Sequence, residues 1–260
     1  MHLRTVTATR YVTPLREGGS LPAVVEADDD GLYVLKFRGA GQGPKALIAE
    51  LVAGEIARAA GLQVPEIVFV ELDAELARTE PDAEIQDLIR ASAGLNLALD
   101  YLPGSVTFDP LVQPVDTEVA AATVWFDAFT MNPDRTVRNT NLLVWHRRVW
   151  LIDHVAALYF HHNWPSAAAT VKSTFAQIKD HVLLRFANNL REIDVRMIER
   201  ITPATIASIV QTIPDVWLAA EPTLADASAL RAAYTRVLSE RLAAPREFVE
   251  EAIRARTLHV

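Results

Sequence analysis

The sequence has no cysteine, no apolar run long enough to span a membrane, and fewer basic than acidic residues. Without cysteine, the chain has neither disulfides nor metal sites built from thiolates. The N-terminus also lacks the apolar core of a signal peptide, and we therefore expect a cytoplasmic protein with no transmembrane segment. The net charge of −8 at pH 7 argues against a protein that works chiefly by binding nucleic acid directly, because such binding depends on basic side chains.

Apolar residues, in contrast, make up 50% of the 260 residues, and this excludes a disordered chain. A chain of this length can bury the core of one large domain or of two lobes. No internal repeat or low-complexity tract is present, apart from a general richness in alanine.

Short alternating or apolar runs predict a strand-rich first part of the chain. The first three runs are separated by short turns, so we expect them to form an antiparallel meander. A helix follows the third run, begins at Lys45 and ends at Gly61. Residues 73–94 are acidic and helix-prone, and we interpret them as a solvated surface segment. The predicted strands are residues 3–13, 22–26, 32–37, 67–72 and 95–102.

Helical patterns dominate after Pro103 and Gly104, which we interpret as a boundary between two lobes. The whole pattern predicts a bilobal α+β fold. A small antiparallel β lobe with one main helix (residues 1–102) precedes a mostly helical large lobe (residues 103–260). Predicted helices of the large lobe include residues 118–131, 224–242 and 246–257.

Polar residues gather at the two ends of a predicted β-hairpin in the large lobe. The apolar runs 142–145 and 149–152 are separated by a short charged turn, which favours two antiparallel strands. Asp153 directly follows the second strand, and a polar loop precedes the first. Because a hairpin brings its two ends together, we expect Asp153 to lie close to that loop.

The loop before the hairpin carries Asp134, Asn139 and Asn141. Carboxylate and amide oxygens suit a hard divalent cation such as Mg²⁺. Asp134 and Asn139 also have the D-x-x-x-x-N spacing of a kinase catalytic loop, in which the Asp faces the acceptor hydroxyl and the Asn binds metal. Asp and Asn are common in turns, however, so the spacing alone arises often by chance.

The strand-rich part offers a second group of candidate residues. Lys36 lies amid apolar residues of the third strand, where it is either a solvent-facing lysine or one that reaches the phosphates of ATP. Glu50, in the helix that follows, either pairs with Lys36 or is an ordinary exposed residue; Glu55 lies further along and is rotated away. The turn Gly18-Gly19-Ser20 allows backbone amides to approach a phosphate.

Four stretches together resemble the HipA-like kinases, a family related to the phosphatidylinositol 3-/4-kinases. They are L-Y-V-L-K-F around Lys36, A-E-L-V-A-G-E-I-A-R-A-A-G-L-Q-V-P around Glu50, N-P-D-R-T-V-R-N-T-N-L-L around Asp134, and W-L-I-D-H-V-A-A-L around Asp153. The resemblance implies a protein-kinase-like fold. It also implies ATP- and Mg²⁺-dependent transfer of the γ-phosphate of ATP to a hydroxyl group.

The resemblance further implies roles for individual residues. Asp134 would accept or orient the acceptor proton, Glu50 rather than Glu55 would hold Lys36, and Asp153 would bind Mg²⁺. Either Asn139 or Asn141 would complete the metal site, and the choice between them stays open. The residues expected to contact ATP are Gly18, Gly19, Ser20, Lys36, Glu50 and the hinge residues Asp100, Tyr101 and Leu102, whose backbone groups would hydrogen-bond the adenine.

Three stretches depart from the expected pattern. Asn132-Pro133 precedes Asp134 in place of His-Arg. Thr136 stands where HipA and the lipid kinases carry His, and His154-Val155 follows Asp153 in place of Phe-Gly. A catalytically weak pseudokinase, a nucleotide-binding regulator and a non-catalytic α+β interaction domain are therefore alternatives to an active kinase. The sequence does not decide which molecule carries the acceptor hydroxyl: a protein Ser or Thr, a small molecule or a lipid head group.

Three histidines, His154, His161 and His162, lie close to Asp153 in the sequence. We interpret them as core or surface histidines rather than as a transition-metal site. Adjacent histidines point their rings apart in most backbones, so we expect the rings of His161 and His162 not to meet.

Overall fold

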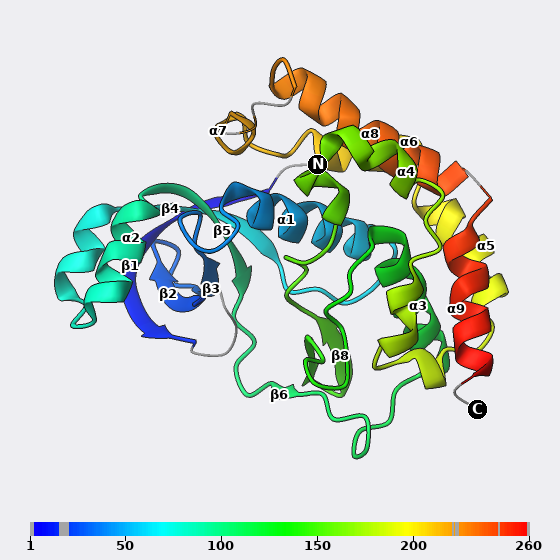
Figure 1. Ribbon diagram of the computed structural model, residues 1–260. Coiled ribbons are helices and arrows are strands. Elements are labelled where there is room, and N and C mark those ends of the chain that lie inside the picture. Colours follow the sequence, from blue (N-terminus) through cyan, green and yellow to red (C-terminus); the bar gives the residue numbers. More distant parts are fainter. Residues whose placement is uncertain (1–2, 16–20, 220, 222–223, 244, 259–260) are drawn as a thin grey trace.

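A closed barrel of five strands forms the N-terminal part of the molecule (Figure 1). The structure is a computed structural model that describes residues 3–15, 21–219, 221, 224–243 and 245–258. The strands pair in the order β1-β2-β3-β5-β4, and all five lie where the sequence predicts a strand. Their bounds are Thr5–Pro14 (β1), Ala23–Ala27 (β2), Leu32–Lys36 (β3), Ile67–Leu72 (β4) and Gly94–Asp100 (β5).

Strands β1, β2 and β3 form the predicted antiparallel meander. The prediction of a wholly antiparallel β lobe is wrong, because β1 runs parallel to β4 and closes the barrel. The first residues of β1, Thr5 to Thr7, pair with β4, whereas the residues from Ala8 to Pro14 pair with β2. Two register shifts bend β1 along its β2 pairing, and a bent strand can serve two neighbours.

Helix α1 (Pro44–Ala59) is the predicted main helix and crosses the middle of the molecule (Figure 1). Pro44 takes the first helical position, where no backbone donor is needed. The helix contacts the barrel strands β4 and β5 and also the helices α6 (Pro203–Val210) and α7 (Asp215–Leu218). Every residue from Leu47 to Ala57 is consequently buried, and Glu50 is not an exposed helical residue.

The acidic segment 73–94 lies on the barrel and is only partly solvated. It forms a short 3-10 helix, Ala74–Thr79, and the helix α2 (Ala83–Ala91). Most of its acidic side chains are exposed, but Ile85 and Ile89 are buried against the barrel core. The prediction of a helix-prone surface segment is therefore right for its polar face.

The rest of the chain is largely helical, with one small antiparallel sheet of the strands β6, β7 and β8. Strands β7 and β8 form the predicted hairpin, whereas β6 has too few residues to show a sequence pattern. The strands are Val106–Thr107 (β6), Leu142–Trp145 (β7) and Arg148–Leu151 (β8). The remaining helices are α3 (Thr117–Thr130), α4 (Ala167–Thr170), α5 (Leu190–Arg200), α8 (Ala227–Ala243) and α9 (Glu247–Thr257).

Two groups of buried apolar side chains hold the molecule together. One fills the barrel, and the larger one joins α1 to the hairpin and to the C-terminal helices. Helix α1 therefore packs with the helical part of the molecule, although the sequence places it between two barrel strands. No helix in the described ranges is long and apolar enough to cross a bilayer.

Candidate active site

The amine of Lys36 lies between two carboxylates that come from different parts of the fold. Its Nζ is 2.5 Å from Oδ1 of Asp153 and 3.7 Å from Oε2 of Glu50. Strand β3 supplies Lys36, helix α1 supplies Glu50, and Asp153 follows β8. Lys36 is only 6% exposed, so it is not a solvent-facing lysine. Burial alone would lower the pKa of Lys36, but the charges of Glu50 and Asp153 outweigh it and raise that pKa.

The carboxylate of Glu50 is held on its other side by His154. Oε2 accepts a hydrogen bond of 2.8 Å from the backbone N–H of His154, and Oε1 lies 3.1 Å from Nδ1 of the His154 ring. Neither side chain is exposed. Burial raises the pKa of Glu50, yet Lys36 and His154 outweigh it and lower that pKa to about 2. Glu50 is therefore ionised near neutral pH and links Lys36 to the residue after Asp153.

The loop before the hairpin folds its polar side chains onto Asp134. Oδ2 of Asp134 accepts hydrogen bonds from the amide of Asn139 at 3.0 Å and from that of Asn141 at 3.2 Å. The backbone N–H of Ile152, next to Asp153, donates to the carbonyl of Asn141 at 3.1 Å. The hairpin thus brings its two ends together, as the sequence predicts. Asn141 and Asp153 have φ of 47° and 56°, a left-handed conformation that Asn and Asp tolerate.

Asp127 of α3 supports this loop through hydrogen bonds, and the sequence analysis did not identify Asp127 as a candidate residue. Its carboxylate accepts hydrogen bonds from Nε of Arg135 at 2.6 Å and from the amide of Asn132 at 3.0 Å, and lies 2.9 Å from Nε2 of His181. Burial raises the pKa of Asp127, but Arg135 and His181 outweigh it and lower that pKa to about 2. Arg135 also donates to the carbonyl of Asn141. The sequence signal that could have identified Asp127 is an acidic residue in the middle of a predicted helix that is otherwise mostly apolar.

The predicted hinge residues lie at the end of β5, but two of them already use their backbone donors. The N–H of Asp100 donates to the carbonyl of Glu66 at 2.8 Å, and the N–H of Tyr101 donates to that of Leu32 at 2.9 Å. Within the described residues, the N–H of Leu102 donates no such bond. Burial and the negative charge of Glu66 raise the pKa of Asp100.

The turn predicted to cover the phosphates of ATP, Gly18, Gly19 and Ser20, lies outside the described residues. Its position relative to Lys36 is therefore a prediction from the sequence alone.

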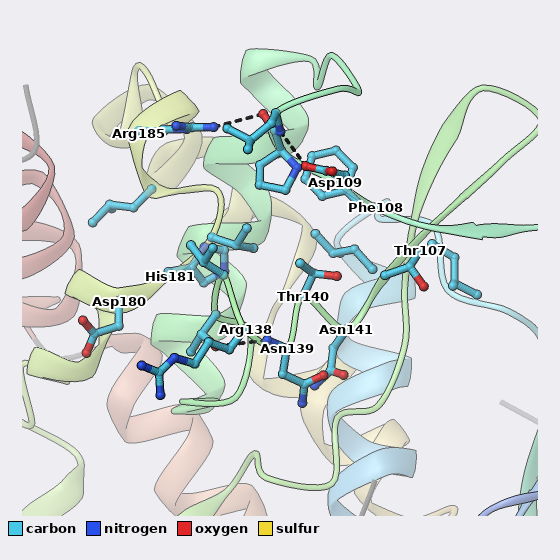
Figure 2. A pocket seen from close by; sticks show the side chains of 18 of the residues that line it. Thr107, Phe108, Asp109, Arg138, Asn139, Thr140, Asn141, Asp180, His181 and Arg185 are labelled. Atoms are coloured by element: carbon cyan, nitrogen blue, oxygen red, sulfur yellow. Dashed lines mark hydrogen bonds between the residues drawn. The ribbon is translucent and has the colours of Figure 1, made fainter. Parts of the chain in front are cut away.

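A cavity of about 1230 Å³ opens beside the loop that carries Asn139 and Asn141 (Figure 2). Asn139 and Asn141 lie together on one side of it, and Phe108 and Arg185 lie across from them. Lys36, Asp134 and Asp153 do not line this cavity, whereas Ile152, next to Asp153, does. A group bound in the cavity would thus lie next to the two asparagines that donate hydrogen bonds to Asp134.

The first three histidines after Asp153 are His154, His161 and His162. Among the described residues, no three His, Asp or Glu side chains are placed to hold a metal ion together. The expectation that the rings of His161 and His162 point apart is wrong, because their Nε2 atoms are 3.2 Å apart. The cause is tertiary, since Nδ1 of His161 lies 2.9 Å from the hydroxyl of Tyr234, which holds that ring in the core.

The fold is similar to those of known kinases. A family model described as HipA-like kinase matches residues 9–248. The crystal structure of a Helicobacter pylori proinflammatory kinase, CtkA, is 15% identical with a TM-score of 0.58, and 100% of each chain is covered. The Golgi casein kinase with Mn and ADP bound is 12% identical with a TM-score of 0.50, over 97% of this chain and 73% of that one. No curated protein matches the sequence. The predicted protein-kinase-like fold with both helices and strands is confirmed.

Proposed function

Because the chain belongs to the HipA-like kinase family, we propose that it transfers the γ-phosphate of ATP to a hydroxyl group in a Mg²⁺-dependent reaction. The observation that carries the proposal is the position of Lys36, 2.5 Å from Asp153 and 3.7 Å from Glu50. Kinase sites combine a lysine that binds phosphates, a glutamate that holds the lysine, and an aspartate that binds metal. We also propose that residues 1–102 and 103–260 act as two lobes with the nucleotide between them.

Lys36 and the hinge are the proposed contacts to ATP. The amine of Lys36 would neutralise phosphate oxygens, while Glu50 keeps it oriented. At the hinge, we propose that the adenine accepts its hydrogen bond from the N–H of Leu102, because Asp100 and Tyr101 use theirs within the protein. The turn Gly18-Gly19-Ser20 would cover the phosphates.

Asp153 is the proposed ligand of Mg²⁺, because this ion prefers carboxylate and carbonyl oxygens and keeps several of its waters. The side chain of Asp153 is 28% exposed and can therefore reach a solvated ion. We propose Asn141 as the second ligand in preference to Asn139, because its backbone pairs with Ile152, next to Asp153. A bound Mg²⁺ supplies positive charge that offsets the charge of the phosphates.

Asp134 is the proposed catalytic residue for the acceptor. Both asparagine amides donate to its Oδ2, which fixes the carboxylate and leaves Oδ1 to accept the proton of a hydroxyl. The acceptor would enter through the cavity beside Asn139 and Asn141, which has room for a small molecule, a lipid head group or part of a protein chain.

Thermal unfolding with ATP, with and without Mg²⁺, tests the proposal first. We expect ATP to raise the melting temperature and Mg²⁺ to increase this shift. If neither changes the melting temperature, the protein does not bind nucleotide and the proposal is refuted.

The second measurement is ATP turnover by the wild type, by Asp134→Ala and by the control Asp87→Ala, in which the substituted residue is exposed on α2. If Asp134→Ala loses turnover but still binds ATP, while Asp87→Ala keeps both, the result supports a catalytic role of Asp134. ATP binding without turnover by the wild type supports a pseudokinase or a nucleotide-binding regulator instead.

A further inference from the structure

His154 makes two separate contacts to one carboxylate. Its backbone N–H donates to Oε2 of Glu50 at 2.8 Å, and its Nδ1 lies 3.1 Å from Oε1 of the same residue. A carboxylate only accepts hydrogen bonds, so the hydrogen of the ring must be on Nδ1. Both oxygens of Glu50 are therefore fixed by a single residue, and that residue directly follows Asp153.

The rest of the surroundings of His154 gives the ring no other polar contact. The side chain has no solvent exposure, and its ring meets that of Phe126 edge-on with 5.7 Å between the centroids. Among the described residues, Nε2 has no hydrogen-bond partner. Gly54 lies on the same side of α1, and a Cβ added there would be 3.8 Å from Nδ1. Burying an imidazole in such a place is costly, and the bond to Glu50 is the interaction that compensates it.

The contact also joins the two halves of the candidate site. Glu50 lies on α1 and reaches Lys36 of the barrel at 3.7 Å, while His154 continues the chain beyond Asp153, whose Oδ1 is 2.5 Å from the same amine. Lys36 must turn from Asp153 to phosphate oxygens when nucleotide and metal bind. Glu50 can hold the amine during that exchange only if its own carboxylate does not rotate.

We propose that His154 is a positioning residue, which locks the carboxylate of Glu50 so that Glu50 directs Lys36 at the phosphates. The inference rests on the proposed kinase function. It also accounts for a departure of the sequence, because a phenylalanine at this position would fill the space but would give Oε1 of Glu50 no donor. His154 itself touches no reacting atom.

The test is a double-mutant cycle on steady-state ATP turnover with His154→Phe, Glu50→Gln and the combined variant. We expect His154→Phe to lower kcat by about tenfold or more, as expected for loss of one hydrogen bond to a charged group. In the Glu50→Gln background the same change should lower kcat less than about twofold, because the two residues act as one unit. His154→Asn, whose side-chain amide can donate in place of Nδ1, should recover most of kcat. Equal losses in both backgrounds, or no recovery with Asn, would overturn the proposal.

The same cycle on the free energy of unfolding in urea separates this inference from the proposed function. Non-additive unfolding energies confirm the contact between His154 and Glu50, and additive ones refute it, whether or not the protein turns over ATP. A wild type that neither binds nor turns over ATP refutes the proposed function and with it the positioning role. A wild type that turns over ATP with an additive kcat cycle refutes the positioning role alone.

Discussion

The carboxylate of Asp127 accepts a hydrogen bond of 2.6 Å from Nε of Arg135, and neither side chain is exposed. The pair connects α3 to the loop that carries Asp134, and Arg135 also donates a hydrogen bond to the backbone carbonyl of Asn141. Removing one partner of a buried ion pair leaves the other charge without compensation. The geometry of the loop that carries Asp134 thus depends on Asp127, a residue that has no direct part in the proposed chemistry.

We predict that Asp127→Ala lowers the free energy of unfolding by about 3 to 5 kcal/mol, since Arg135 is then buried without a counter-charge. Urea unfolding followed by circular dichroism measures the change. The control is Asp87→Ala, which breaks an exposed pair with Arg90 and should cost at most about 1 kcal/mol. Equal losses in the two variants would show that the buried pair does not stabilise the loop.

Stability should fall in acid, because two buried carboxylates have lowered pKa values. Folding lowers the pKa of Asp127 from 3.8 and that of Glu50 from 4.5, each to about 2. A group with a lowered pKa stabilises the fold above its unfolded pKa, and this contribution is lost as the pH falls through the folded value. We expect a loss on the order of 2 to 3 kcal/mol per group between about pH 5 and pH 2.

Two buried histidines extend this effect to milder pH. Burial lowers the pKa values of His161 and His181 below 6.5, so the unfolded chain binds their protons first and stability begins to fall below about pH 6.5. Urea unfolding at a series of pH values measures the profile, and Asp127→Asn should flatten its acid limb. A wild-type profile that is flat from pH 7 to pH 3 would contradict the assigned shifts.

Lys36→Met should weaken the binding of Mg-ATP by at least about tenfold, equal to 1.4 kcal/mol, because the substitution removes the positive charge proposed to face the phosphates. Titration calorimetry gives the dissociation constant. Lys45→Met is the matched control, since Lys45 pairs with Glu221 and donates to the carbonyl of His161 instead. Unchanged ATP affinity in Lys36→Met would rule out the proposed phosphate contact.

Local patterns predicted the elements that bear the site, because each depends on nearby residues. Strand β3, helix α1 and the β7–β8 hairpin lie where periodicity and turns place them, and these elements alone bring Lys36, Glu50 and Asp153 together. Of the two glutamates on α1, Glu50 is the one that pairs with Lys36, at 3.7 Å, which agrees with the preference for it over Glu55. That choice came from the resemblance to the HipA-like kinases, because the residues alone did not distinguish a paired Glu50 from an ordinary exposed one.

Features that depend on distant partners were not predictable. The parallel pairing of β1 with β4 joins residues far apart in the chain, and no turn signals it. The sequence of helix α1 has a pattern typical of a helix with one apolar face. In the structure the barrel covers one side of the helix and the C-terminal helices cover another, so Glu55 is buried as well. Asp127 was not identified as a site residue, because its partners Arg135 and His181 become its neighbours only in the folded chain.

The choice between Asn139 and Asn141 as the metal ligand can be decided by the Mg²⁺ dependence of ATP turnover. Asn141 is buried and pairs through its backbone with Ile152, whereas Asn139 is exposed. We predict that Asn141→Ala raises the Mg²⁺ concentration for half-maximal rate by about tenfold or more, equal to 1.4 kcal/mol, because the ion then loses one of its proposed protein ligands. Asn139→Ala should change it less, because its amide would then serve only to hold Asp134. Both variants retain Asp134 and Asp153, so a larger effect of Asn139→Ala would reverse the assignment and return the metal to the D-x-x-x-x-N position.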